Sequence, residues 1–103
     1  MFYESGKNDH GLARAPFKSI AVPRPIAWLS TLSPDGVPNL APYSQFTNLN
    51  FNPPYIMISI NEGGHNIRKD TPINIEETGE FVHNMVTYDL RNQLNITAVN
   101  HHL

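Results

Sequence analysis

Four short runs of the chain have the hydrophobic pattern of β-strands. They are residues 26–32, 37–41, 55–60 and 81–86. The first run follows Pro23-Arg24-Pro25, whose prolines keep the backbone before it extended. The third run has Ile56, Ile58 and Ile60 on one face, which is the alternation of a half-buried strand. The pattern predicts a mainly β or α+β domain.

Turn residues between the first two runs predict a β-hairpin. Pro34 occupies a favoured turn position, and the Asp35-Gly36 pair that follows is a strong hairpin signal. Residues 37–41 are therefore expected to return antiparallel to residues 26–32. Pro38 and Pro42 have no N–H to donate, so we expect this returning strand at an edge, at a bulge or facing a ligand.

Capping residues predict two short helices. Thr71 is the expected N-cap of the first, with Pro72 at its first position and Gly79 beyond its end. Asp89 is the expected cap of the second helix, whose shared face is formed by Leu90, Leu94, Thr97 and Ala98.

Four strands are few for a barrel with a buried interior. The expected fold is therefore a partly closed barrel with an exposed edge.

Composition narrows the class of protein. A chain of 103 residues has room for one domain with a modest core, and a formal charge of -2 gives no reason to expect nucleic acid as a partner. The absence of cysteine excludes disulfides, thiolate metal sites and cysteine catalysis. Residues 1–11 contain no apolar run, so neither a signal peptide nor a membrane span is expected there, and a cytoplasmic location is the default.

The ends of the chain and the histidines carry little chemistry. Residues 1–15 have no clear period and are expected to form an N-terminal arm. The adjacent His101 and His102 lie near no spaced carboxylates, and His65 and His83 are isolated in sequence. No metal site is therefore expected.

Residues 68–72, Arg-Lys-Asp-Thr-Pro, place two cations and a hydroxyl at the start of the first predicted helix. Free N–H groups and the helix dipole favour an anion at such a position, and a phosphate group would suit it. Arg24, held extended between two prolines, is a further phosphate candidate. The alternatives are a solvated basic pair beside an ordinary N-cap and, for Arg24, a surface ion pair.

Residues 39–46, Asn-Leu-Ala-Pro-Tyr-Ser-Gln-Phe, combine small residues with amide and hydroxyl groups. Together with Thr47 they offer donors and acceptors that match the ring edge and ribityl chain of a flavin. Ser30 and Thr31 have hydroxyls that could reach a ligand across the hairpin, although Thr31 also suits a strand. The alternative is a polar loop that bonds to its own backbone. Trp28 is expected to be a core or interface residue rather than a ring-stacking partner.

The chain resembles the flavin reductase-like proteins of the FMN-binding split-barrel superfamily, in the flavoredoxin-like branch. The resemblance covers roughly residues 16–98 and rests on the order and spacing of several motifs. These are Arg24-Pro25-Ile26-Ala27-Trp28, Ser30-Thr31, Asp35-Gly36, Asn39-Leu40-Ala41-Pro42, Ser44-Gln45-Phe46, Asn52-Pro53-Pro54, Lys69-Asp70-Thr71, Asn74-Ile75, Glu77-Thr78-Gly79-Glu80-Phe81-Val82 and Asn84.

The resemblance implies a split β-barrel that binds FMN non-covalently, usually as a homodimer with the flavin near the subunit interface. It assigns flavin or phosphate contacts to Ser30, Thr31, Asn39, Leu40, Ala41, Ser44, Gln45, Phe46, Lys69 and Thr71, to which Arg24 is added as a phosphate candidate. Family members reduce flavin with NADH or NADPH, and some supply reduced flavin to a partner oxygenase. Because the cofactor carries the hydride, no catalytic acid or base is expected.

The ending departs from the resemblance. Family members usually run well beyond 103 residues, and residues 99–103 no longer follow the expected pattern. We therefore expect an arm at residues 1–15, the N-terminal part of the barrel domain at residues 16–98 and a divergent tail at residues 99–103. The alternatives to flavin reduction are a non-catalytic FMN-binding or interaction module and another split-barrel oxidation, of the pyridoxamine-phosphate-oxidase type.

Overall fold

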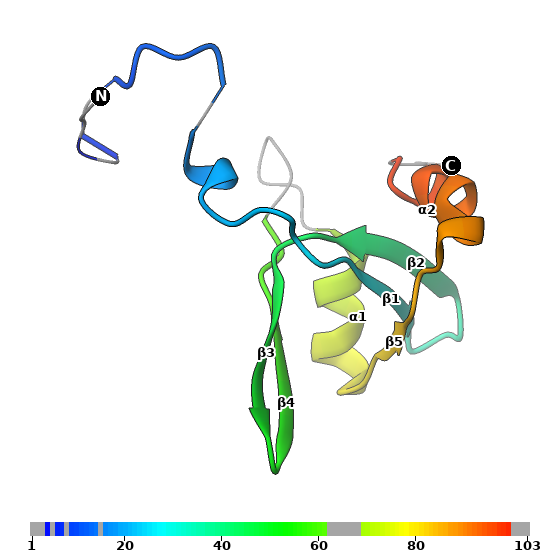
Figure 1. Cartoon of the computed structure of the whole chain (residues 1–103). Coiled ribbons are helices and arrows are strands. Elements are labelled where there is room, and N and C mark those ends of the chain that lie inside the picture. The colour runs from blue at the N-terminus through cyan, green and yellow to red at the C-terminus, as the bar shows by residue number, and fades with distance from the viewer. Residues whose placement is uncertain (1–3, 5, 8, 15, 62–68, 100–103) are drawn as a thin grey trace.

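The computed structural model describes residues 4, 6–7, 9–14, 16–61 and 69–99, and these form strands and short helices in the order shown in Figure 1. In chain order the elements are η1 (Pro16–Ser19), β1 (Ala27–Leu32), β2 (Pro38–Tyr43), β3 (Phe46–Phe51), β4 (Pro54–Ile58), α1 (Asp70–Thr78), β5 (Val82–Asn84), η3 (Tyr88–Leu90) and α2 (Arg91–Thr97). The described residues do not include His65, Arg68 or the His101-His102 pair.

The central unit is a three-stranded antiparallel sheet in the order β2-β1-β5. The predicted hairpin between β1 and β2 is confirmed. Its turn is closed by Gly36 N, which donates to Ser33 O at 2.9 Å, and by Val37 N, which donates to Ser33 Oγ at 3.0 Å. Gly36 has a φ of 83°, a left-handed conformation that glycine adopts without strain.

A second sheet, the β3–β4 hairpin, projects from the three-stranded sheet (Figure 1). β3 was not among the predicted strands. Its register shifts between Asn48 and Asn50, and this irregularity interrupts the alternation by which a strand is recognised in a sequence. The two sheets do not form a closed barrel in the described part of the chain, in agreement with the prediction of an open barrel.

The helices begin earlier or later than predicted, and both predicted N-caps are wrong. Lys69 is the N-cap of α1 and makes no capping bond with its side chain, while Thr71 lies inside the helix with its hydroxyl bonded to β2. The second helix, α2, follows the 3-10 turn η3, so Asp89 is not its cap. Gly79 ends α1 as predicted, with a φ of 77° and its N–H on Ile75 O at 2.7 Å.

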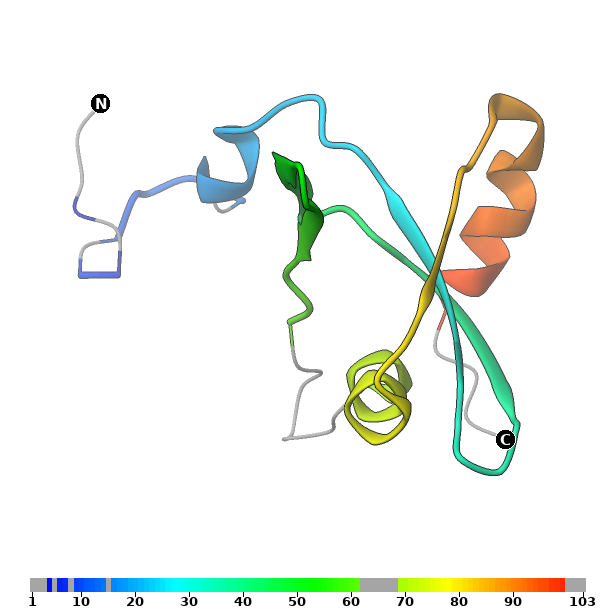
Figure 2. The same cartoon turned by 90° about the horizontal axis from the view of Figure 1, so that it is seen from below.

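The core is small and centres on β1. Its buried apolar residues are Ala27, Trp28, Leu29 and Leu94. α1 covers one face of the three-stranded sheet and α2 lies against the other (Figure 2). Side chains alternate along β1, so Thr31 faces α1 and Trp28 faces α2. Among the described residues no helix is long and apolar enough to cross a membrane.

Candidate functional site

An open pocket of about 790 Å³ lies on the α2 face of the three-stranded sheet. Residues from all three strands and from the segment before α2 line it, among them Trp28, Ser30, Leu40, Asn84, Met85 and Leu90. The register explains this grouping, because Leu40 lies opposite Ser30 and Asn84 lies opposite Trp28. Partners in neighbouring strands point to the same face of a sheet. The pocket is therefore a mainly apolar surface with a few polar groups.

Trp28 forms one wall of this pocket and is held in place at its edge. Its Nε1 donates to Thr97 Oγ1 at 3.0 Å, and the Thr97 hydroxyl donates to Leu94 O at 2.7 Å. The indole is only 7% exposed. Trp28 is thus the buried residue that the sequence predicted, and it also contributes to the pocket.

Asn84 supplies the polar edge of the pocket. Its Nδ2 donates to Trp28 O at 3.0 Å and to Ser30 Oγ at 3.2 Å, with a longer contact of 3.4 Å to Val82 O. These bonds tie the short strand β5 to β1. They also bring a hydroxyl and a carboxamide side by side.

A second polar cluster lies on the opposite face of the sheet, where β2 meets the start of α1. Asn39 Nδ2 donates to Thr71 Oγ1 at 3.0 Å, and Tyr43 Oη donates to the same oxygen at 2.7 Å. Thr71 is completely buried, and Lys69 Nζ lies 5.7 Å from the centroid of the Tyr43 ring. The Thr71 hydroxyl therefore joins the helix to two positions of β2, and the ammonium group of Lys69 lies close to this junction.

Thr31 belongs to this second face as well. Its Oγ1 accepts from Asn74 Nδ2 at 3.0 Å, and both residues are buried. The bond joins the middle of α1 to β1. The Thr31 hydroxyl is thus used within the fold.

The residues predicted from the sequence are consequently divided between the two faces. Ser30 and Leu40 lie in the pocket, whereas Thr31, Lys69 and Thr71 lie on the α1 side. Asn39 lines the pocket while its side chain bonds to Thr71 on the α1 side, and Ala41 lies opposite Leu29.

The remaining candidates lie at or beyond the ends of the first two strands. Arg24 is half-buried in the segment before β1. Ser44 and Gln45 form the bend between β2 and β3, where Gln45 O accepts from Ser59 N at 2.8 Å. The Phe46 ring lies 5.2 Å from the His83 ring. The bend and the start of β3 thus carry three candidates in a row, and the Phe46 ring contacts His83, which lines the pocket.

The sequence interpretation did not select four residues that the structure places at these sites: Tyr43, Asn74, His83 and Asn84. Asn74 and Asn84 were named only as parts of the family motifs. The hydrogen-bond partner of Asn74 is 43 positions away along the chain, and the β1 partners of Asn84 are 54 and 56 positions away. Tyr43 lay within the polar segment without a role of its own. His83 Nε2 is buried and has no hydrogen-bond partner among the described residues. No sequence period marks such long-range partners.

Burial raises the pKa of Tyr43 above its ordinary value of 10.0; the bond to Thr71 lowers it, and the nearby Asp70 carboxylate raises it further. Above pH 10 the unfolded chain therefore releases this proton before the folded chain does. The stability contributed by the neutral phenol is present below that pH and is lost as pH rises. We therefore expect the urea concentration at the unfolding midpoint to be lower at about pH 11 than at about pH 8.

The urea midpoint of Tyr43→Phe should decrease less than that of the parent chain over this pH range, because the variant has no phenol at this position to ionise. At about pH 8 its midpoint should already be lower than that of the parent chain, because one hydrogen bond is lost. Tyr88→Phe is the matched control, since the Tyr88 side chain is 77% exposed. The assignment fails if Tyr43→Phe and the parent chain lose stability equally over this range.

Comparison with known proteins places this geometry in a family. The family model described as "Flavin reductase like domain" matches residues 19–101. A protein of Aquifex aeolicus is 46% identical over 79 residues, which are 77% of this chain and 40% of that protein. The YwrF protein of Bacillus subtilis is 40% identical over 79 residues, 75% of this chain and 37% of that protein. Both relatives are described as uncharacterized.

Two solved structures are similar over most of the chain. Nitrilotriacetate monooxygenase component B from Bacillus cereus has a TM-score of 0.85 at 31% identity, covering 97% of this chain and 50% of that one. The 2-nitrobenzoate 2-nitroreductase NbaA of Pseudomonas fluorescens has a TM-score of 0.73 at 32% identity, covering 82% and 40%. The match confirms the predicted fold class, a mainly β split barrel of the flavin reductase type that is not closed within the described residues. The chain spans half or less of the length of these proteins, and it belongs to the flavin reductase-like domain family.

Proposed function

We propose that the chain binds FMN non-covalently and takes part in hydride transfer from NADH or NADPH to the flavin. The observation that carries the proposal is the pocket on the α2 face, in a chain of this family. Its volume of about 790 Å³ lies within the range of small-molecule sites. It combines an indole wall with a hydroxyl and a carboxamide, and these polar groups fit the polar edge of a planar ring.

In this proposal the flavin ring lies against Trp28, Ser30 and Leu40. The backbone of residues 39–41 runs along the ring, and residues 44–46 extend this wall at the bend after β2. Lys69 holds the phosphate at the start of α1, with Arg24 as a further cation for it. In this proposal the ribityl chain crosses the edge strand β2, where Asn39 lines the pocket and bonds to Thr71 in the first turn of α1.

In this proposal Thr31 and Thr71 do not contact the flavin; they hold α1 in place against the sheet. Both hydroxyls are buried and bonded within the fold, Thr31 to Asn74 and Thr71 to Asn39 and Tyr43. We therefore assign them to the placement of α1, and with it of Lys69, against the sheet.

When bound, FMN supplies a ring that accepts a hydride and passes electrons on. The residues of the chain bind this ring, orient it and exclude water from one of its faces. We assign no residue as a catalytic acid or base.

The colour of the purified protein tests the proposal. A yellow protein that bleaches when NADH or NADPH is added without oxygen would support turnover. A yellow protein that never bleaches would support the alternative, a non-catalytic FMN-binding module. A colourless protein that takes up no added FMN would contradict both.

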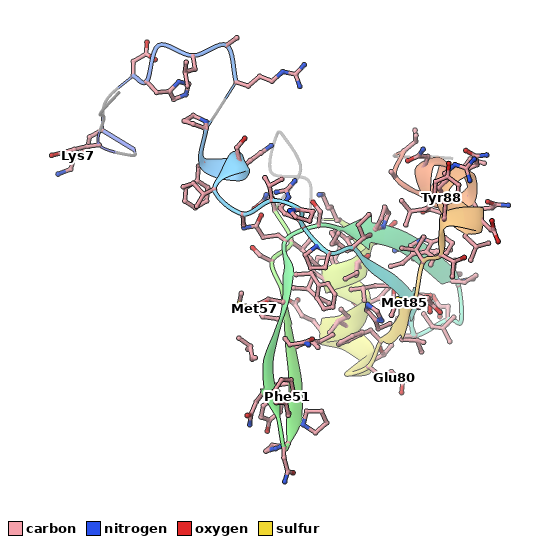
Figure 3. All side chains as sticks on the ribbon, in the orientation of Figure 1. Lys7, Phe51, Met57, Glu80, Met85 and Tyr88 are labelled. Atoms are coloured by element: carbon pink, nitrogen blue, oxygen red, sulfur yellow. The ribbon has the colours of Figure 1, made fainter. Side chains whose placement is uncertain are left out.

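We further propose that the chain forms a homodimer. Large apolar side chains are exposed on the β3–β4 hairpin, where Phe51 and Met57 project away from the three-stranded sheet (Figure 3). Such exposed apolar surface indicates an interface. Light scattering should give twice the chain mass, and a monomer at micromolar concentration would contradict the proposal.

An oxygenase that receives reduced flavin is a second partner in this proposal. It is supported by the similarity to the Bacillus cereus protein, which is component B of a monooxygenase. The cytoplasmic location remains a prediction from the sequence.

A further inference from the structure

The hydrogen bonds at the polar edge of the pocket determine which atoms there donate and which accept. Asn84 Nδ2 lies 3.0 Å from Trp28 O and 3.4 Å from Val82 O. Backbone carbonyl oxygens only accept hydrogen bonds. The end of the carboxamide that faces them must therefore be the NH₂ group, so the orientation of this amide is fixed by its surroundings.

Ser30 takes its role from the same nitrogen. Asn84 Nδ2 lies 3.2 Å from Ser30 Oγ, and because this amide nitrogen only donates, Ser30 Oγ is the acceptor. The hydrogen of the Ser30 hydroxyl points elsewhere. Within the described ranges, no acceptor receives it and no donor bonds to Asn84 Oδ1.

Both residues that carry these groups line the pocket and are half-buried. They come from the adjacent strands β1 and β5, on the face that also carries Trp28. The two residues thus offer the pocket one hydroxyl donor next to one carbonyl acceptor, on a mainly apolar surface.

We propose that Ser30 and Asn84 recognise the edge of an amide or cyclic imide, in which a carbonyl oxygen stands next to an N–H. The Ser30 hydroxyl donates to that carbonyl, and Asn84 Oδ1 accepts from that N–H. Two ligands carry this edge, the imide of a flavin ring and the carboxamide of nicotinamide. The inference deepens the proposed function and rests on it for the choice of these two ligands.

Methylated ligands test the pair directly, with the emission of Trp28 as the measure of binding. Lumiflavin is compared with 3-methyllumiflavin, and nicotinamide with N,N-dimethylnicotinamide; methylation removes the N–H and keeps the carbonyl. In the pair that uses this site, we expect the methylated compound to bind roughly three- to tenfold more weakly than the unmethylated one, because it loses one hydrogen bond. Asn84→Ala should bind both members equally, while Asn92→Ala on α2 should keep the preference.

Ser30→Ala provides the second variant, because it leaves the bonds of Asn84 to both carbonyls in place. It should weaken both members of the pair by roughly three- to tenfold and keep the preference, and Ser30→Thr should restore the affinity. A preference that disappears in Asn84→Ala supports the inference whichever ligand shows it.

Equal binding of both members of each pair by the unmodified chain overturns the inference. If neither pair shows a preference but lumiflavin binds, the inference is overturned and the proposed flavin site is left intact. A preference confined to nicotinamide would support the inference and contradict the placement of the flavin ring in this pocket. Unchanged affinity in Ser30→Ala, or no binding of any of the four compounds, also overturns it.

Discussion

Thr71→Val should lower the free energy of unfolding by about 2–4 kcal/mol, because the substitution removes the acceptor of two hydrogen bonds and leaves their donors unpaired. Asn39 Nδ2 and Tyr43 Oη both donate to Thr71 Oγ1, and Thr71 is completely buried. Valine has the same shape, so the loss reports the hydroxyl and not a cavity. Urea unfolding followed by the emission of Trp28 measures it.

Thr71→Ser retains the oxygen and should recover most of this loss. Thr78→Val is the matched control in the same helix, because the Thr78 hydroxyl makes only local contacts, to Asn74 O at 2.7 Å and to Glu80 O at 3.5 Å. We expect that control to change stability by less than about 1 kcal/mol. If Thr71→Val is as stable as Thr78→Val, the Thr71 hydroxyl does not join β2 to α1.

Lys69→Met should weaken FMN binding roughly tenfold or more and leave riboflavin binding within about twofold, because only FMN carries the phosphate that an ammonium group would bind. Lys69 is the N-cap of α1 and its Nζ lies close to the Tyr43 ring. Methionine keeps the length of the side chain and its packing on that ring but removes the charge. Affinities for both flavins are measured by the change in Trp28 emission.

Lys18→Met is the control for a change in net charge, because Lys18 lies in η1 and is exposed. It should leave both flavin affinities unchanged. Equal weakening of FMN and riboflavin by Lys69→Met would remove Lys69 from the phosphate site while leaving the ring site untested by that variant. No effect on either flavin would place the phosphate elsewhere, with Arg24 as the next candidate.

The parts of the fold that depend on local chemistry could be predicted from the sequence. The β1–β2 hairpin follows from Asp35-Gly36, and the end of α1 follows from Gly79. β3 could not be predicted in this way, since its bulge between Asn48 and Asn50 breaks the alternation. The predicted N-cap of α1 was wrong because the Thr71 hydroxyl does not cap the helix but is a buried acceptor for two residues of β2.

The candidate site was predicted as a set of residues but not as an arrangement. Asn39 and Leu40 are consecutive in a strand, so their side chains must point to opposite faces, and the sequence alone already implied this division. What it did not imply is that Asn84 joins Ser30 at the pocket, because that bond spans 54 positions. Contacts of this kind depend on β5 pairing with β1.

The central claim, that the pocket on the α2 face is the flavin site, can be tested through Trp28, the one tryptophan of the chain. Flavins absorb where tryptophan emits, so a flavin in the pocket must quench this residue. The measurement is a titration of Trp28 emission with FMN, corrected by a parallel titration of free N-acetyltryptophanamide. Saturable quenching at one FMN per chain is the expected result. Emission that follows the free amide throughout, while the protein holds FMN after gel filtration, would place the flavin elsewhere and contradict the account.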